Sequence, residues 1–299
     1  MTTRQVRGFG LIGVPTSAGS HNAGQDKAPA AWRAAGLVRR LSERGIEVED
    51  LGDLPVQRHR AAPVIQGVRD LDRVVEIAEL TADRVSDTVR MGLLPLVLGG
   101  DCTITAGVVA GLRRHRDIGL AYLDGDADLS TPEDTGSGVL DTMGMTHMLG
   151  GGAESLAGIG TTKEPLLQPA QVALLGFDPA ELSTEQWGRL SALHLHATPV
   201  DAVRADPAGA AAAALAHLGA GTDAVLVHFD VDALDTGAFP LADFPHFNGL
   251  TLDQVEAVLA RLCRSPALAG MVVTEANPDH DPDGTMLATL AALLARVLG

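Results

Sequence analysis

Two short apolar segments of the chain each lead directly into closely spaced aspartates. Within each group the aspartates are separated by single residues, and the two groups together comprise Asp124, Asp126, Asp128, Asp230 and Asp232. In an extended chain, residues i and i+2 point to the same side, so each group of carboxylates should converge on one point. A bound cation would offset the repulsion between them, and oxygen ligands suit hard ions such as Mn²⁺ or Mg²⁺. A solvated acidic loop is the common alternative, but the repetition of the pattern favours a metal centre.

Two further segments place reactive side chains after apolar runs. Residues 96–98 are followed by a Gly-Gly pair, Asp101 and Cys102, and residues 270–274 are followed by Glu275. A lone cysteine is usually a small core residue. Because this cysteine follows a strand and a tight turn, a place beside the metal is an equally open interpretation.

These side chains must be positioned by the elements that precede them. Apolar runs alternate with helical patterns, which predicts an α/β fold with a mostly parallel sheet between two layers of helices, in one domain spanning residues 1–299. Functional sites in such sheets lie outside the carboxyl ends of the strands. Strands are expected at residues 8–14, 46–51, 96–98, 119–123, 172–175, 193–200, 224–227 and 270–274, and helices at residues 28–44, 71–91, 103–114, 141–149, 208–218, 250–262 and 285–298.

The composition argues against several classes of function. The formal net charge is −16 and no basic surface is evident, which argues against nucleic acid as a partner. No run reaches the ~18 apolar residues of a membrane span. Residues 1–8 are polar and show no signal peptide. The cysteines, Cys102 and Cys263, are too few and too far apart for a disulfide framework. We therefore expect a soluble cytoplasmic protein.

Several motifs, in the right order along nearly the whole chain, resemble those of the ureohydrolase family, which includes arginases, agmatinases, formimidoylglutamases and guanidino-acid hydrolases. Residues 99–102 (Gly-Gly-Asp-Cys) resemble Gly-Gly-Asp-His of that family, and residues 124–128 (Asp-Gly-Asp-Ala-Asp) resemble Asp-Ala-His-x-Asp. Residues 229–235 (Phe-Asp-Val-Asp-Ala-Leu-Asp) resemble Phe-Asp-Val-Asp-x-Leu-Asp, and residues 275–278 (Glu-Ala-Asn-Pro) resemble Glu-x-Asn-Pro. The resemblance implies an arginase-like three-layer α/β/α fold and assembly into homo-oligomers, trimers or hexamers.

The resemblance also implies a reaction and roles for particular residues. In that family two Mn²⁺ ions share a bridging hydroxide that attacks the guanidinium carbon, and urea leaves. The metal ligands matched here are Asp124, Asp128, Asp230 and Asp232. Glu275 matches the carboxylate that pairs with the substrate guanidinium. Loop residues are expected to contact the rest of the substrate: Ser130, Thr135, Ser137 and Asp178.

Three histidines of the family pattern are replaced in this chain. Cys102 and Asp126 stand at metal-ligand positions, and Asp141 stands at the position of a proton shuttle. Asp126 remains a suitable ligand for a hard cation, whereas the thiolate of Cys102 suits Mn²⁺ poorly, so its metal position is either weakened or selective for another ion. One or two ions, Mn²⁺ first among them, are expected at Cys102, Asp124, Asp126, Asp128, Asp230 and Asp232, and the candidate catalytic residues are Asp128, Asp141 and Glu275.

Two histidines lie close to these motifs in the sequence. His147 follows Asp141, and His228 precedes the second group of aspartates, so either is a possible replacement for the lost proton shuttle. A structural role is the favoured interpretation for both. The whole pattern predicts a metal-dependent hydrolase that cleaves a C–N bond of a guanidino or amidino compound, such as N-hydroxyarginine, agmatine or a guanidino acid. The alternative is a ureohydrolase-like protein that binds a ligand without turnover.

Overall fold

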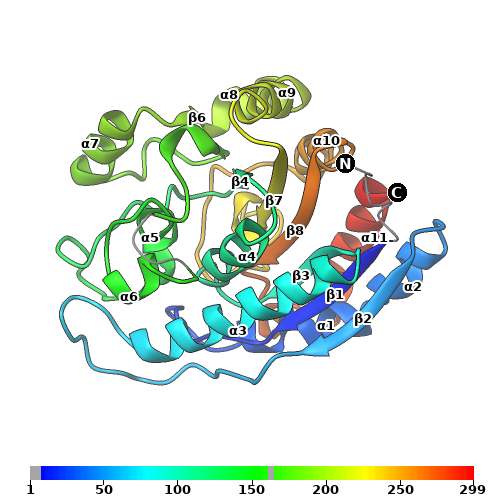
Figure 1. Cartoon of the computed structure of the whole chain (residues 1–299), viewed down its shortest axis with the longest axis horizontal. Coiled ribbons are helices and arrows are strands. Elements are labelled where there is room, and N and C mark those ends of the chain that lie inside the picture. Colours follow the sequence, from blue (N-terminus) through cyan, green and yellow to red (C-terminus); the bar gives the residue numbers. More distant parts are fainter. Residues whose placement is uncertain (1–7, 161–164) are drawn as a thin grey trace.

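The computed structural model describes residues 8–160 and 165–299. Residues 1–7, which include most of the polar stretch considered above, and residues 161–164 lie outside the described chain. Within the described ranges, eight strands form one sheet in which every neighbouring pair is parallel (Figure 1). Their order is β2-β1-β3-β8-β7-β4-β5-β6. The strands are β1 Phe9–Val14, β2 Val48–Asp53, β3 Leu94–Gly99, β4 Ile118–Leu123, β5 Val172–Leu175, β6 His196–Thr198, β7 Ala224–Asp230 and β8 Leu268–Thr274.

The four central strands, β3, β8, β7 and β4, are buried along almost their whole length. Strands covered on both faces have continuous apolar sequences rather than alternating ones, so their segments are recognisable in the sequence. The edge strands β2 and β6 are partly exposed. The predicted α/β fold, with helices on both faces of a parallel sheet, is confirmed.

Helices cover both faces of the sheet (Figure 1). One layer consists of α3, α4, α5, α6 and α7, and the other of α1, α2, α8, α9, α10 and α11. These helices are α1 Ala28–Ala34, α2 Leu37–Ser42, α3 Leu71–Arg90, α4 Ile104–Arg113, α5 Gly144–Met148, α6 Glu154–Ala157, α7 Thr184–Leu193, α8 Val200–Ala205, α9 Pro207–Leu218, α10 Leu252–Cys263 and α11 Thr285–Leu298.

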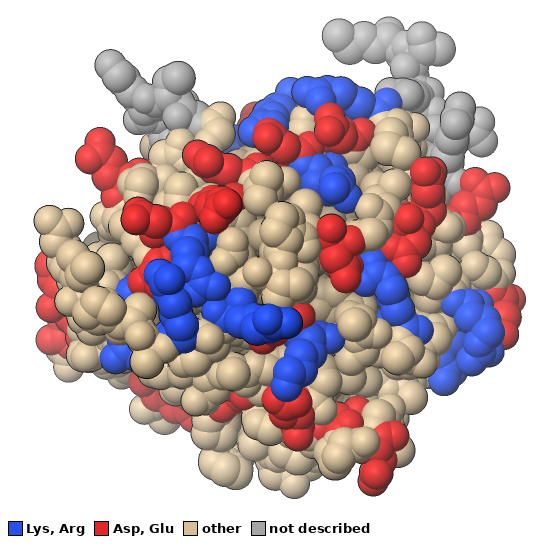
Figure 2. Space-filling view, turned by 90° about the horizontal axis from the view of Figure 1, so that it is seen from below, with Lys and Arg blue, Asp and Glu red and all other residues tan. Residues whose placement is uncertain are grey.

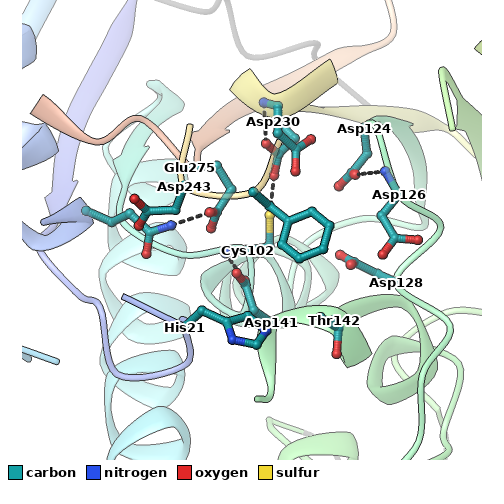
Figure 3. Close-up of a pocket in the computed structure, with 13 residues that line it drawn as sticks. His21, Cys102, Asp124, Asp126, Asp128, Asp141, Thr142, Asp230, Asp243 and Glu275 are labelled. Carbon is teal, nitrogen blue, oxygen red and sulfur yellow. Dashed lines mark hydrogen bonds between the residues drawn. The ribbon is translucent and has the colours of Figure 1, made fainter. Parts of the chain in front are cut away.

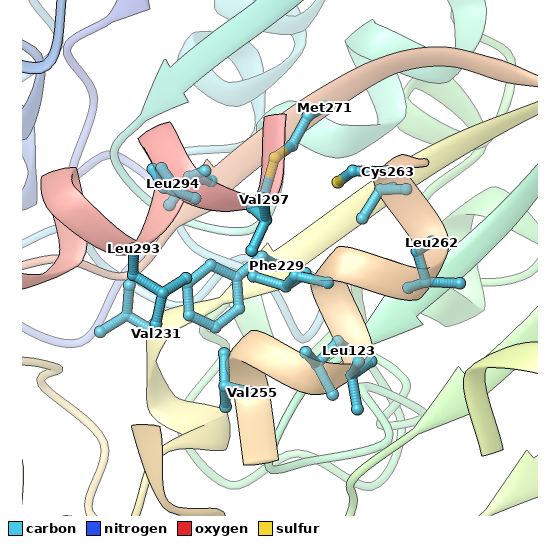
Figure 4. Packing of buried hydrophobic residues seen from close by; sticks show 14 of the residues in the cluster. Leu123, Phe229, Val231, Val255, Leu262, Cys263, Met271, Leu293, Leu294 and Val297 are labelled. Carbon is cyan, nitrogen blue, oxygen red and sulfur yellow. The ribbon is translucent and has the colours of Figure 1, made fainter. Parts of the chain in front are cut away.

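Side chains alternate between the two layers along each central strand. Leu123 and Phe229 pack into the layer of α10 and α11, where Phe229 lies among residues such as Val255 (Figure 4). Tyr122 is one residue earlier in β4 and packs into the layer of α3 and α4. In the register of the sheet, Tyr122 is paired with His228, so both side chains lie on the α4 side.

Three predicted elements differ from those observed. The helix expected over residues 28–44 is two helices, because Gly36 adopts a left-handed φ of 78° between α1 and α2. The segment 141–149 begins with the 3-10 turn Asp141–Met143 before α5. The strand expected over residues 193–200 is reduced to the short β6, because α7 extends to Leu193, His194 adopts a left-handed φ of 53°, and α8 begins at Val200.

The surface carries both signs of charge. On the face shown in Figure 2, Lys and Arg side chains are interspersed with Asp and Glu side chains. Ion pairs between described residues include those of Arg33 with Asp50 and of Arg114 with Asp83. Among the described residues, no helix is both long enough and apolar enough to span a bilayer.

Candidate metal centre and substrate pocket

A pocket opens beyond the carboxyl ends of the central strands (Figure 3). We call it the central pocket, and it is lined by His21, Gln25, Cys102, Asp124, Asp126, Asp128, Asp141, Thr142, Asp230, Asp232, Asp243, Phe244 and Glu275. Every residue predicted above as metal-ligating or catalytic is among those that line it.

The ends of the strands deliver the acidic side chains to the pocket. β4 ends directly before Asp124, β7 ends at Asp230, and β8 ends directly before Glu275. Glu275 has a φ of 64°, a left-handed conformation that turns the chain away from the strand direction at this point. Parallel strands therefore bring together carboxylates that are up to 151 positions apart in the sequence, from residue 124 to residue 275.

The Gly-Gly turn after β3 brings Cys102 to the same place. A side chain at Gly100 would place its Cβ 1.7 Å from the carbonyl oxygen of Thr16, so only glycine fits this close approach. The turn leads to Cys102, whose backbone N–H donates to Asp141 Oδ1 at 2.7 Å. The side chain of Cys102 is buried, with its Sγ 3.2 Å from Thr274 Oγ1.

Four buried side chains offer ligand atoms that all lie within 4.8 Å of one another: Cys102, Asp124, His228 and Asp230. His228 Nε2 is 3.7 Å from Asp124 Oδ2 and 3.9 Å from Asp230 Oδ2. It is also 3.9 Å from Cys102 Sγ. The two nitrogen–oxygen separations are too long for hydrogen bonds. They match the spacing of two ligands of one ion, roughly 3–4 Å when each ligand is about 2.1 Å from the metal. We call this group the first cation position.

The ring of His228 is oriented for such a role. Its Nδ1 is 2.9 Å from Thr105 Oγ1, and a proton on Nδ1 satisfies this hydrogen bond while leaving the lone pair of Nε2 toward the carboxylates. Burial lowers the pKa of His228 to about 3. The ring is therefore neutral near pH 7, which is the form of imidazole that binds metals. This arrangement differs from the purely structural role favoured from the sequence.

The acids of the pocket are withdrawn from water, and this changes their pKa values. Burial raises the pKa of Asp124, Asp128 and Asp230, and neighbouring carboxylates raise it further. Burial also raises the pKa of the Cys102 thiol well above its usual value, with Asp230 adding to the effect. A buried group of acids is stable only when protons or cations neutralise it. The donor set therefore fits divalent cations.

Glu275 has one carboxylate oxygen without a partner. Gln25 Nε2 donates to Glu275 Oε2, whereas Glu275 Oε1 is buried and accepts no hydrogen bond from the described residues. Ligand atoms of Cys102, Asp141 and Glu275 lie within 4.8 Å of one another, and the Glu275 side chain lines the central pocket. A buried, unsatisfied acceptor is rare in folded proteins and indicates a place for a cationic or hydrogen-bonding ligand.

The predicted substrate contacts lie outside the lining of the central pocket: Ser130, Thr135, Ser137 and Asp178. The hydroxyls of Thr135 and Ser137 are 3.1 Å apart. Ser130 Oγ accepts from Gln186 Nε2 at 3.3 Å, and Asp178 Oδ2 accepts from Asn248 Nδ2 at 2.9 Å. Their roles toward a substrate stay predictions.

His147 is also absent from the lining of the pocket. It is fully buried, its Nδ1 lies 2.7 Å from the carbonyl oxygen of Met143, and burial lowers its pKa to about 4. These contacts support the structural role favoured for it from the sequence.

The sequence points to two loops beside the site: residues 16–28, for which a substrate-binding loop and an ordinary connection are equal interpretations, and residues 236–248, expected at the mouth of the pocket. It assigns no individual role to their side chains at the site, which are His21, Gln25, Asp243, Phe244 and, next to the pocket, His246, and it does not identify Thr142. A signal for His228 was available, because it lies two positions before Asp230 in the same strand and so on the same face. His246 lies in the loop between β7 and α10, where no periodicity predicts direction. Its Nε2 is 3.5 Å from Asp232 Oδ2. Burial opposes its charged form, but Asp232, Glu181 and Asp126 raise its pKa to about 9.

Comparisons with known proteins identify the family to which this fold and pocket belong. The sequence profile of the Arginase family matches residues 7–299. An arginase from Brevibacillus brevis is 31% identical over 300 residues, which cover 98% of each chain. The solved structure of the arginase from Bacillus caldovelox superposes with a TM-score of 0.88 at 28% identity, again over 98% of each chain. The chain belongs to the arginase family.

A more distant structure shares the fold alone. The formimidoylglutamase from Bacillus subtilis matches with a TM-score of 0.78 at 19% identity, over 100% of this chain and 88% of that one. The three-layer architecture is therefore shared by proteins named for different activities, so the pocket and not the fold determines the substrate.

Proposed function

We propose that this protein hydrolyses a C–N bond of a guanidino or amidino compound with the help of divalent cations, Mn²⁺ or a related ion. The observation that best supports this is the meeting, in one buried pocket, of aspartates from β4 and β7 with the unpaired Oε1 of Glu275. The substrate class comprises arginine derivatives such as N-hydroxyarginine, agmatine and guanidino acids. Urea or a urea analogue is the expected product.

The residues present fit divalent cations by number, burial and donor type. Cys102, Asp124, His228 and Asp230 would hold one ion. Bound ions of this kind polarise a substrate and make a water molecule more acidic. The thiol and imidazole are softer donors than carboxylates, so this position favours Zn²⁺ or Co²⁺ relative to Mn²⁺.

Glu275 would bind and orient the substrate. Gln25 holds its Oε2, which fixes the plane of the carboxylate and leaves Oε1 to accept an N–H of the guanidinium. A planar guanidinium and a carboxylate form strong charge-assisted hydrogen bonds. The other acids of the pocket add to its attraction for a cationic group. A neutral urea product would lose this charge pairing and be released.

Asp141 would hold or move a proton beside the reacting group. Burial raises its pKa well above the usual range, and the nearby Asp101 adds to this effect. A raised pKa brings the carboxyl closer to the neutral range in which a general acid or base works best. This removes an objection raised by the ordinary pKa of aspartate, which is too low for proton transfer near pH 7.

The test is an assay of urea release from a panel of guanidino compounds by the full chain loaded with Mn²⁺, Co²⁺ or Zn²⁺, with bound metal measured on the same samples. Metal-dependent urea release from at least one compound would support the proposal. Bound metal with no product from arginine, N-hydroxyarginine, agmatine or guanidino acids would contradict it and support a ligand-binding protein.

The family resemblance also supports assembly into a homo-oligomer, either a trimer or a hexamer. Measurement of the molar mass in solution by light scattering tests this proposal, and the mass of one chain would contradict it.

A further inference from the structure

His246 is a buried histidine that points one ring nitrogen at the acidic pocket. The residue is 2% exposed. Its Nε2 is 3.5 Å from Asp232 Oδ2 but makes no hydrogen bond with any described residue. The backbone is held by two hydrogen bonds to Thr236, one from the His246 N–H to Oγ1 and one from the Thr236 N–H to the His246 carbonyl oxygen, both 2.9 Å long.

Glu181 holds the other side of the ring. Its Oε2 lies 2.6 Å from His246 Nδ1, close enough for a strong charge-assisted hydrogen bond. When the Nδ1 proton is directed at this carboxylate, the lone pair of Nε2 is free to bind a metal ion on the side of Asp232. A carboxylate behind a histidine is the usual arrangement around a metal-binding imidazole, because it fixes the tautomer and the ring plane.

The ring occupies space that the neighbouring strand end leaves open. An added Cβ at Gly125 would lie 2.5 Å from His246 Cδ2 and 2.9 Å from the carbonyl oxygen of Asp232. The resembled family motif has alanine at this position and histidine at the next one, whereas this chain has Gly125 and Asp126. Compared with the family motif, this chain therefore lacks the imidazole at position 126 and has one at His246 instead. The absence of a side chain at Gly125 makes room for the ring of His246.

We propose that His246, oriented by Glu181, is the imidazole ligand of a second divalent cation, which it holds together with Asp232. The separation of 3.5 Å between Nε2 and Asp232 Oδ2 suits two ligands of one ion, for which roughly 3–4 Å is expected. His246 thus supplies, from the loop after β7, the nitrogen that residue 126 no longer provides. The inference rests on the metal-dependent function proposed above and assigns the ligands of its second ion.

Mn²⁺ binding to the metal-free full chain, followed by calorimetry and by electron paramagnetic resonance, tests this assignment. Wild type should bind two ions per chain and show the spectrum of a magnetically coupled pair. His246→Asn keeps a side-chain N–H for Glu181 but has no counterpart of Nε2. Loss of the groups that orient a ligand lowers metal affinity by about 10–100-fold. Loss of the ligand itself should therefore lower the affinity for the second ion by at least about a hundredfold.

Two further variants distinguish a role of His246 as a metal ligand from a role as the partner of a structural ion pair. His147→Asn removes an equally buried histidine outside the central pocket and should leave both ions in place. Asp126→His in the His246→Asn background returns an imidazole to the position that has one in the resembled motif, and it should restore the second ion. Unchanged binding of two ions by folded His246→Asn would overturn the inference.

The design remains informative if His246→Asn does not fold. Glu181→Gln leaves the imidazole in place but removes the negative charge beside its Nδ1. This change should lower the affinity for the second ion by about 10–100-fold. An unchanged second affinity in Glu181→Gln would then overturn the inference. Failure of the proposed function has a different signature: two ions bound in a His246-dependent way, with no urea from any guanidino compound.

Discussion

The imidazole of His228 stacks on the phenol ring of Tyr122, with ring centroids 3.9 Å apart and ring planes 7° from parallel. The two residues are paired in the register of β7 and β4, so the stack joins the two strands that deliver the aspartates. The Tyr122 hydroxyl donates to Asp128 Oδ2 at 2.5 Å, and Thr105 holds the far side of the histidine ring. The aromatic pair thus joins His228, a member of the first cation position, to Asp128, which lines the central pocket.

Tyr122→Phe should therefore weaken metal binding in the central pocket while keeping the stack. The phenylalanine ring retains the contact with His228, but Asp128 loses its hydrogen-bond donor. Changes to partners of this kind cost about 10–100-fold in metal affinity. Calorimetric titration of the metal-free protein with Co²⁺ measures this, and an affinity equal to that of wild type would show that the hydroxyl has no part in the site.

Cys102→Ser should change which metals the protein prefers. A hydroxyl is a poorer ligand than a thiolate for Zn²⁺ and Co²⁺, so their affinities should fall much more than that of Mn²⁺. In the Co²⁺-loaded protein, the charge-transfer absorption of a thiolate–cobalt bond should be present in wild type and absent in the variant. Cys263→Ser is the matched control, because Cys263, the last residue of α10, is buried outside the central pocket. Loss of the band in the control instead would place the metal elsewhere.

Glu275→Gln should abolish turnover and leave metal binding largely intact. Breaking a buried ion pair by removing one partner costs about 3–5 kcal/mol, so kcat/KM for a guanidino substrate should fall at least about a hundredfold. Glutamine preserves the shape of the side chain, and Gln25 can still donate to its oxygen. Steady-state urea release, with metal content measured in parallel, provides the comparison. Turnover near the wild-type level would remove Glu275 from the role of guanidinium partner.

The metal-free protein should lose stability in alkali through His246. Its pKa is raised to about 9, and Asp232, Glu181 and Asp126 are the charged groups that face it. A raised histidine pKa contributes stability that is fully present below the unfolded value of about 6.5 and is lost as the pH rises through about 9. The difference in unfolding free energy between wild type and His246→Asn should shrink over this window. Mn²⁺ should suppress this pH dependence because it takes the place of the proton, and a constant difference in the metal-free protein would contradict the prediction.

Phe229→Ala should destabilise the fold strongly. The ring is fully buried in the layer of α10 and α11 (Figure 4), directly before Asp230 at the end of β7. Truncation of a buried phenylalanine costs about 3–5 kcal/mol. Urea unfolding of the metal-free protein should show a loss of this size. A loss below about 1 kcal/mol would mean that this layer repacks around the cavity.

Much of the fold and of the acidic site could be predicted from the sequence, because local rules determine both. The central strands are buried on both faces and appear as apolar runs, and alternation places Asp124 and Asp126 just beyond β4 and Asp230 at the end of β7. The break at Gly36 was missed because the helical pattern continues across it, although the backbone there is left-handed.

The nitrogen donors were harder to predict for physical reasons. His228 follows the alternation rule, but its neighbours Tyr122 and Thr105 come from other elements and are brought to it only by the register of the sheet and the packing of α4. His246 lies in a loop whose path depends on Thr236 and on the space at Gly125. No local pattern encodes that path. The path of the predicted substrate loop around Thr135, which lies outside the pocket lining, is likewise not encoded by a local pattern.

Urea release on adding Mn²⁺ back to the metal-free protein tests the central claim most directly. The full chain is stripped with a chelator, Mn²⁺ is added back in steps, and urea release from the best guanidino substrate is followed against the number of bound ions per chain. The account predicts no turnover without metal and a rise that is complete when two ions are bound. Urea release that is independent of metal, or its absence with both ions bound, would contradict the account.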